Sequence, residues 1–178
     1  MAQYLKILRD SDIFSKKETK KDIKYIDRQT VKAIVVNKKG GVALVTNAIH
    51  HLYLLPGGGA ESNNLEIEII RECLEEINQE IEVSSIVGKT QEFRGRDAKK
   101  YITTCFFARA IKKVKKDSRT EKEIENGLKV VWVNKKRLKS IFDTQETRVT
   151  SGKVSFYNAA FNIIRDKIFV DKWLKFFE

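Results

Sequence analysis

A segment in the first half of the chain combines three consecutive glycines with a dense run of acidic residues. Residues 57–83 read GGGAESNNLEIEIIRECLEEINQEIEV, and seven glutamates lie between Glu66 and Glu82 with one base, Arg71, among them. The whole chain has 35 lysines and arginines against 24 aspartates and glutamates, a net charge of +11. A surface built at random from this composition would be basic, so this local reversal of charge needs a physical cause.

Hydrophobic periodicity predicts that this segment contains a helix. Ile70, Cys73, Leu74 and Ile77 fall at i, i+3, i+4 and i+7, the spacing of a core-facing stripe. The glutamates at 68, 72, 75 and 76 gather on the opposite side, where repulsion among like charges, with the 76/80 pair included, costs about 1–2 kcal/mol. A hard divalent cation would turn that repulsion into coordination. A solvated acidic face is the alternative.

The residues themselves resemble a known motif. Residues 71–76, RECLEE, resemble the R-E-U-x-E-E core of the Nudix box, in which U is aliphatic, and residues 55–59, LPGGG, stand where that family has its glycine-rich turn. The resemblance runs from about Tyr25 to Val133. It implies an α/β protein, a Nudix-like α/β/α sandwich with a mixed β-sheet and the box helix packed on that sheet.

Two departures from the family pattern bear on the site. Asn63 or Asn64, depending on loop length, stands where the pattern has a glutamate that would pair with the box arginine. Glu61 or Glu75 is a substitute partner, and the sequence leaves open whether activity suffers. Asn78 replaces the glycine that closes the box helix. Asparagine is the residue that next best tolerates the left-handed C-cap conformation, so we expect it to fill that role.

The resemblance also assigns roles to the acidic residues. It implies a bound Mg²⁺, with Mn²⁺ as an alternative, held mainly by Glu72 and Glu76 and by the carbonyl of Gly57. Glu75 would be a further ligand or the catalytic base. Arg71 would orient a glutamate or contact phosphate, as its rigid fork of donors allows.

Other candidate residues lie outside this core. Gly57 and Gly58 lack side chains, so their backbone can approach metal and phosphates closely, although a plain tight turn would use the same residues. Arg28 is a candidate for substrate binding, with simple exposure as the alternative. A distal glutamate often completes such sites, and the candidates are Glu121, Glu123 and Glu125. Because Glu123 fits a capping box, we prefer Glu125.

These assignments lead to one expected function and two alternatives. We expect a Mg²⁺-dependent Nudix hydrolase that cleaves the diphosphate linkage of a nucleotide-derived small molecule. The net charge of +11 favours an RNA 5′-end pyrophosphohydrolase or decapping-type enzyme instead. The missing box glutamate favours a non-catalytic nucleotide-binding module. The motif does not name the substrate, because specificity resides in loops and in the last helix, outside the motif.

Composition and patterning set the organisation of the chain. Residues 1–22 are expected to form a charged, weakly structured arm or a short helix, and residues 23–178 a single domain that includes C-terminal helices. Strands are expected at 31–36, 42–46, 52–55, 81–93, 101–111 and 128–133, a one-turn helix between 120 and 127, a short helix at 134–142, and one or two helices within 155–177.

Cellular location and assembly can be inferred only broadly. No apolar run approaches the ~20 residues that a membrane span needs, and no export signal is evident, so we expect a cytoplasmic protein without a membrane partner. Cys73 and Cys105 are expected to be buried and reduced. Proteins of the resembled family are frequently dimers, and a homodimer is compatible with the sequence.

Overall fold

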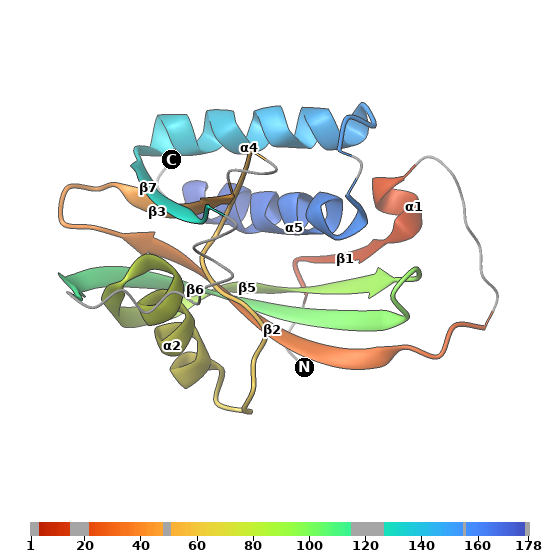
Figure 1. Ribbon diagram of the computed structural model, residues 1–178, viewed down its shortest axis with the longest axis horizontal. Coiled ribbons are helices and arrows are strands. Elements are labelled where there is room, and N and C mark those ends of the chain that lie inside the picture. Colours follow the sequence, from red (N-terminus) through yellow and green to blue (C-terminus); the bar gives the residue numbers. More distant parts are fainter. Residues whose placement is uncertain (1–3, 15–21, 48–50, 115–126, 155, 177–178) are drawn as a thin grey trace.

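The computed structural model describes residues 4–14, 22–47, 51–114, 127–154 and 156–176. These residues form a mixed sheet between two layers of helices, which confirms the predicted fold class (Figure 1). The strands are β1 (Lys6–Arg9), β2 (Ile26–Val36), β3 (Val42–Asn47), β4 (Leu52–Leu54), β5 (Gln79–Arg94), β6 (Lys99–Lys113) and β7 (Lys129–Val133). The helices are α1 (Asp10–Ile13), α2 (Leu65–Ile77), α4 (Lys135–Thr150) and α5 (Tyr157–Leu174).

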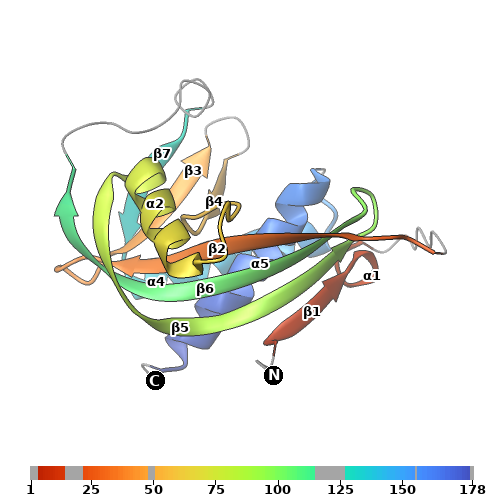
Figure 2. The same ribbon diagram turned by 90° about the horizontal axis from the view of Figure 1, so that it is seen from below.

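Strand β2 lies near the centre of the sheet, and its side chains pack against the helical layers on both faces. The order is β1-β5-β6-β2-β3-β4, with β7 also paired to β3. β2 runs parallel to β6 along its whole length, whereas β5 and β6 form an antiparallel hairpin. Because side chains alternate along a strand, Val31 and Ala33 pack on the side of α2, and Ile34 packs on the side of α4 and α5. Figure 2 shows α2 in front of this part of the sheet and α5 behind it.

The buried stripe of α2 differs in phase from the prediction. Ile69, Cys73 and Ile77 are buried against the sheet, whereas Ile70 is 38% exposed and Leu74 is only half-buried. The predicted stripe was therefore wrong at two of its four positions. The reason is that α2 packs against both the sheet and the glycine turn. The covered face therefore extends toward the acidic side of the helix, and the apolar residues at 70 and 74 turn outward.

The two ends of α2 follow the capping rules. At the start, the side chain of Asn64 accepts a hydrogen bond from the amide of Ile67 at 3.3 Å. At the end, Asn78 has φ 52° and ψ 39°, which confirms the predicted left-handed C-cap. The helix stops at Ile77, so Glu80 lies in β5 and its expected repulsion with a helical Glu76 is not made within the helix.

The N-terminal segment is more ordered than the sequence predicted. Residues Lys6–Arg9 form β1, which pairs in parallel with β5, and the expected short helix is the four-residue α1 that follows. The strand was missed because four residues carry too little alternation to predict it. Pairing with the outer edge of β5 stabilises β1, and the carboxylate of Asp10 fastens the segment by accepting hydrogen bonds from the Gly95 amide and the Tyr157 hydroxyl.

Helices α4 and α5 cover the opposite face of the sheet from α2. α4 extends eight residues beyond its predicted end at residue 142, because no glycine or proline interrupts the chain before Gly152. The amide of Gln145 accepts a hydrogen bond from the Tyr53 amide at 2.7 Å and donates one to the Tyr53 carbonyl at 2.9 Å, which binds α4 to β4.

The expected one or two C-terminal helices form a single helix, α5. None of the helices in the described residues is long and apolar enough to cross a membrane. The one-turn helix expected between 120 and 127 falls almost wholly outside the described residues.

Replacing Asn78 tests the C-cap of α2. Asn78→Ala should lower the free energy of unfolding by about 1 kcal/mol, because a Cβ is strained in the left-handed region and alanine lacks the local hydrogen bonding of asparagine. Asn78→Gly should be neutral or stabilising. Urea unfolding measures both values. Equal stability of the alanine and glycine variants would contradict the role of the backbone conformation.

Candidate active site

The glycine turn lies along the edge of β2 as an additional, irregular strand. The amide of Val31 donates to the Gly58 carbonyl at 2.9 Å, and the amide of Ala33 donates to the Pro56 carbonyl at 3.0 Å. Gly57 has φ +125°, and a Cβ at this position would lie 2.2 Å from the Val31 carbonyl oxygen. Glycine is thus required at 57 by conformation and by space.

The turn also contacts α2 directly. The amide of Gly57 donates to Oε2 of Glu76 at 2.7 Å. A Cβ on Gly58 would lie 2.6 Å from Oε2 of Glu72, so a side chain at 58 would displace that carboxylate. The structure therefore brings together the two motifs that the sequence singled out, the glycine turn and the acidic helix.

Arg71 lies at the centre of the acidic side of α2. Its guanidinium pairs with Glu72 at 2.7 Å, with Glu75 at 2.8 Å and with Glu68 at 3.0 Å. It also donates to the carbonyl of Gly59 at 3.4 Å, which links the helix to the glycine turn. One cation thus offsets much of the repulsion expected among these glutamates.

Besides Glu72, two glutamates pair with Arg71 where the family pattern supplies one. Glu75, which the sequence offered as a substitute for the missing glutamate, contacts Arg71, whereas no contact between Arg71 and Glu61, the other substitute, is seen in the described residues. Glu68 also contacts Arg71 and was missed, although its i, i+3 spacing was a usable signal. Hydrogen bonds from Ser62 and from Arg71 lower the pKa of Glu68 from 4.5 to about 2.

Glu72 experiences the opposite effect. Burial raises the pKa of Glu72, against the attraction of Arg71 and Lys32, because a carboxylate removed from water is disfavoured in its charged form. Its side chain is 11% exposed and faces the space that Gly58 leaves open. The attraction of Arg71 and Lys32 therefore does not fully offset the cost of burying this carboxylate.

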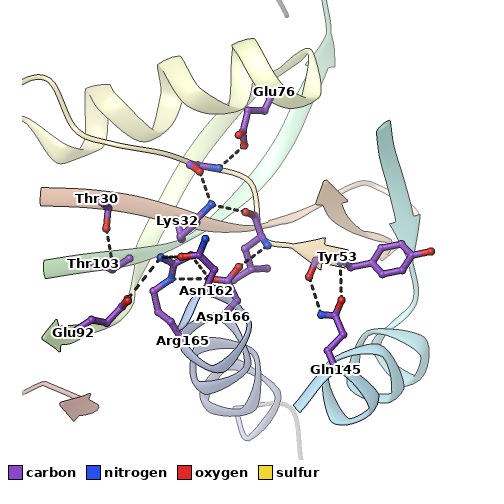
Figure 3. Close-up of polar contacts among 12 residues, drawn as sticks. Thr30, Lys32, Tyr53, Glu76, Glu92, Thr103, Gln145, Asn162, Arg165 and Asp166 are labelled. Carbon is purple, nitrogen blue, oxygen red and sulfur yellow. Dashed lines mark hydrogen bonds and ion pairs between the residues drawn. The ribbon is translucent and has the colours of Figure 1, made fainter. Parts of the chain in front are cut away.

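On the other side of the turn, a buried lysine holds the same backbone. Lys32 in β2 donates to the carbonyl of Leu55 at 2.9 Å and to the carbonyl of Gly57 (Figure 3). The amide of Leu55 in turn donates to Asp166 of α5 at 2.9 Å. Sequence reasoning missed Lys32, although one lysine within the apolar strand VKAIVV was a visible irregularity. The Gly57 carbonyl, expected to bind metal, faces this ammonium group.

The donor set fits a hard cation in chemistry. Glu72, Glu75 and Glu76 offer the carboxylate oxygens that Mg²⁺ prefers, and the missing side chain at Gly58 leaves room beside Glu72. Within the described part of the chain, no three acidic, histidine or cysteine side chains converge as a metal site, since Arg71 draws two of these glutamates to itself. The distal candidates Glu121, Glu123 and Glu125 lie outside the described residues.

Arg28 stands beside the turn on the outer part of β2. It is exposed, and a Cβ on Gly59 would lie 2.4 Å from its guanidinium. Both residues line an open cleft of about 620 Å³, with Lys99 and Tyr101 of β6 on its far wall. Cys73 and Cys105 are both buried, as expected, and burial raises the pKa of each thiol.

The lowered pKa of Glu68 predicts a pH dependence of stability. The folded pKa of about 2 lies below the ordinary 4.5, so the charged form stabilises the fold above pH 4.5, and this contribution is lost as pH falls toward 2. Glu68→Gln should weaken the fall in urea midpoint over this range. The matched control Glu66→Gln, at an exposed position of the same helix, should follow the wild type. Identical pH profiles for all three proteins would contradict the assignment.

Comparison with known proteins agrees with this geometry. The NUDIX domain family model matches residues 27–154. A solved NUDIX hydrolase from Nitrosomonas europaea is similar in fold, with a TM-score of 0.55 and 15% identity over 65% of this chain and 78% of that chain. A MutT protein from Methanosarcina mazei Go1 gives a TM-score of 0.48 and 20% identity over 65% and 83%. No curated protein sequence matches the chain. Because the matched segment contains both the glycine turn and the α2 carboxylates, the chain belongs to the Nudix family, whose enzymes are diphosphatases.

Proposed function

We propose that this protein is a Mg²⁺-dependent hydrolase that cleaves the diphosphate linkage of a nucleotide-derived small molecule. One observation carries the proposal: the glycine turn and the carboxylates of α2 lie in direct contact, through Gly57 with Glu76 and through Gly58 against Glu72. A diphosphate bound along the exposed backbone of the turn would lie next to these acids. Carboxylates alone would repel it, so the arrangement requires a cation between them.

The side chains suggest how the cation is held. Glu72, Glu75 and Glu76 would bind Mg²⁺, which when bound neutralises phosphate oxygens and lowers the pKa of a coordinated water. Glu75 is accessible for a second role as the base, since its side chain is 41% exposed, against 11% for Glu72. Arg71 holds Glu72 and Glu75 in place by its ion pairs and so positions the ligands.

Lys32 and Arg28 would act on the substrate's charge. Lys32 presents its ammonium at the Gly57 carbonyl on the side of the turn away from Glu76, and Arg28 stands beside Gly59. Both positive groups border the backbone where phosphate oxygens would approach. Their positive charge would attract any anionic substrate, whichever group is linked to its diphosphate.

One alternative retains a specific observation in its favour. The cleft beside the turn is lined by Arg28 and Lys99, and the chain is strongly basic, which would suit the phosphates of an RNA 5′ end. Binding that weakens steeply with added salt would support this reading. The non-catalytic alternative loses its main argument, because Glu68 and Glu75 supply the partners of Arg71 that the missing box glutamate would have provided.

Removing one candidate ligand tests the proposed chemistry. Glu76→Gln should lower Mg²⁺-dependent hydrolysis by orders of magnitude, because the amide is a far weaker metal ligand than the carboxylate. Its oxygen can still accept the hydrogen bond from Gly57, so the fold should persist. The assay is phosphate or pyrophosphate release from a panel of nucleotide sugars, dinucleotides, nucleoside triphosphates and capped RNA. Glu66→Gln is the matched control. A folded Glu76→Gln variant that hydrolyses at the wild-type rate would refute the role.

A Mg²⁺ titration of thermal stability tests the metal independently of turnover. A cation that binds only the folded state at 100 times its Kd adds about 2.7 kcal/mol to the free energy of unfolding, so the melting temperature should rise with Mg²⁺. Lys32→Met should increase this rise in melting temperature. The Gly57 carbonyl oxygen is an expected metal ligand, and the Lys32 ammonium would no longer compete with Mg²⁺ for it. A flat titration in the wild type would count against the metal site. A response unchanged in Lys32→Met would show that the lysine does not compete.

A further inference from the structure

A second cavity adjoins the glycine turn on the face of the sheet that α5 covers. It has a volume of about 300 Å³ and is bordered by Gly57–Gly59 at one end. Its other walls come from β2, β5, β6 and α5, and the residues that matter for its chemistry are Lys32, Arg94, Tyr101, Asn158, Asn162 and Arg165. None of these was singled out from the sequence as a site residue.

Arg94 of β5 is fixed in this cavity by an ion pair, a ring contact and two hydrogen bonds to amide oxygens. Its side chain is 3% exposed and pairs with the buried carboxylate of Glu92, with Nε 2.9 Å from Oε2. Its guanidinium lies over the ring of Tyr101, 4.2 Å from the ring centroid. It also donates to Oδ1 of Asn158 and to Oδ1 of Asn162, each at 2.8 Å. The arginine is therefore rigidly held and fixes the two asparagines in turn.

The orientation of both asparagine amides follows from this contact. A guanidinium has only donors, so the amide atom facing Arg94 must be the oxygen. Asn162 is held twice, since its oxygen also accepts from Arg165 at 3.1 Å. The NH₂ groups of Asn158 and Asn162 must then point away from the arginines, and both residues line the cavity. Figure 3 shows the Asn162 side chain above Arg165, toward Lys32.

The acidic and the basic side chains at the cavity differ in whether a ligand can contact them. Glu92 and Asp166 lie beneath it with fully buried side chains, and each is engaged by an arginine. The cationic residues Lys32, Arg94 and Arg165 line the cavity itself. The charged and amide side chains that line the cavity therefore offer donors, beside the hydroxyls of Thr30 and Tyr101, and no free carboxylate lies among the described lining residues. A surface on which side-chain donors predominate favours ligand groups that present oxygen acceptors.

We infer that this cavity is a second substrate subsite that binds an oxygen-acceptor group, with Asn158 and Asn162 as its specificity-determining residues. The inference rests on the proposed function, because the cavity meets the glycine turn where the diphosphate would lie. The acceptor comes either from the carbonyl edge of a nucleobase or from a phosphate group. Both present oxygens without donors, and the two sources are separable by experiment.

Asn162→Asp changes the donor while leaving the supporting contacts. The aspartate keeps an oxygen for Arg94 and Arg165 but replaces the NH₂ group with a second acceptor. Asn134→Asp is the matched control: it adds the same charge at the N-cap of α4, where Asn134 accepts from the Arg137 amide at 2.8 Å and aspartate caps equally well. The probes are UMP against CMP, GMP against AMP, and pyrophosphate, and their Kd values are measured by calorimetry in the presence of Mg²⁺.

Two patterns would support the subsite and identify the acceptor. If the acceptor is a base carbonyl, the wild type prefers UMP to CMP or GMP to AMP, and Asn162→Asp reduces or reverses that preference by about tenfold. The two nucleotides of each pair carry the same charge, so the ratio of their Kd values reports recognition of the base alone. If the acceptor is phosphate, the ratios stay near one, while Asn162→Asp weakens pyrophosphate binding by about tenfold relative to Asn134→Asp.

Two results would overturn the inference. One is that Asn162→Asp binds every probe as Asn134→Asp does, and the other is that the wild type binds none of them. Either result leaves the proposed function standing if the wild type still shows Mg²⁺-dependent hydrolysis of the nucleotide panel. Conversely, a clear change in probe binding without any hydrolysis would support the subsite and refute the enzyme.

Discussion

The arrangement of this protein depends on the backbone of Gly57 being held from both sides. Its amide bonds to Glu76 of α2, and its carbonyl bonds to Lys32 of the central strand. Through Leu55, the same short stretch is also bonded to Asp166 of α5. One turn of backbone therefore links both helical layers through the edge of β2, and a shift in any of the three would move the backbone on which the proposed diphosphate lies.

The acidic patch persists in a basic chain because it is neutralised in part from within. Arg71 binds three glutamates and the carbonyl of Gly59, and Lys32 lies near enough to Glu72 to oppose the rise in its pKa. These cations fix the acids without saturating them, since burial still leaves Glu72 with a raised pKa. The contact of these acids with the glycine turn, where a diphosphate would lie, is the physical reason to propose a metal.

The sequence predicted the features that depend on local pattern. The glycine turn, the acidic helix, the Asn78 cap and the mixed sheet follow from spacing and from backbone preferences. It did not predict which side of α2 is covered, because the position of the neighbouring glycine turn is set by its hydrogen bonds to β2, a strand distant in sequence. The pairing of β1 with β5 joins distant segments and has no local signature. Lys32 was visible as a lysine in an apolar strand, but its partners, the carbonyls of Leu55 and Gly57, come from another segment and could not be predicted.

The contact between Gln145 and Tyr53 has a consequence for the molecule's behaviour in concentrated solution. A primary amide carries the same donor and acceptor as a peptide group, so this side chain imitates the neighbour that an outermost strand lacks. The outward-facing amide and carbonyl of Tyr53 in β4 are thereby both bonded to α4 of the same molecule. Strand-to-strand joining with a second molecule, the usual first step of fibrous aggregation, is blocked at that border of the sheet.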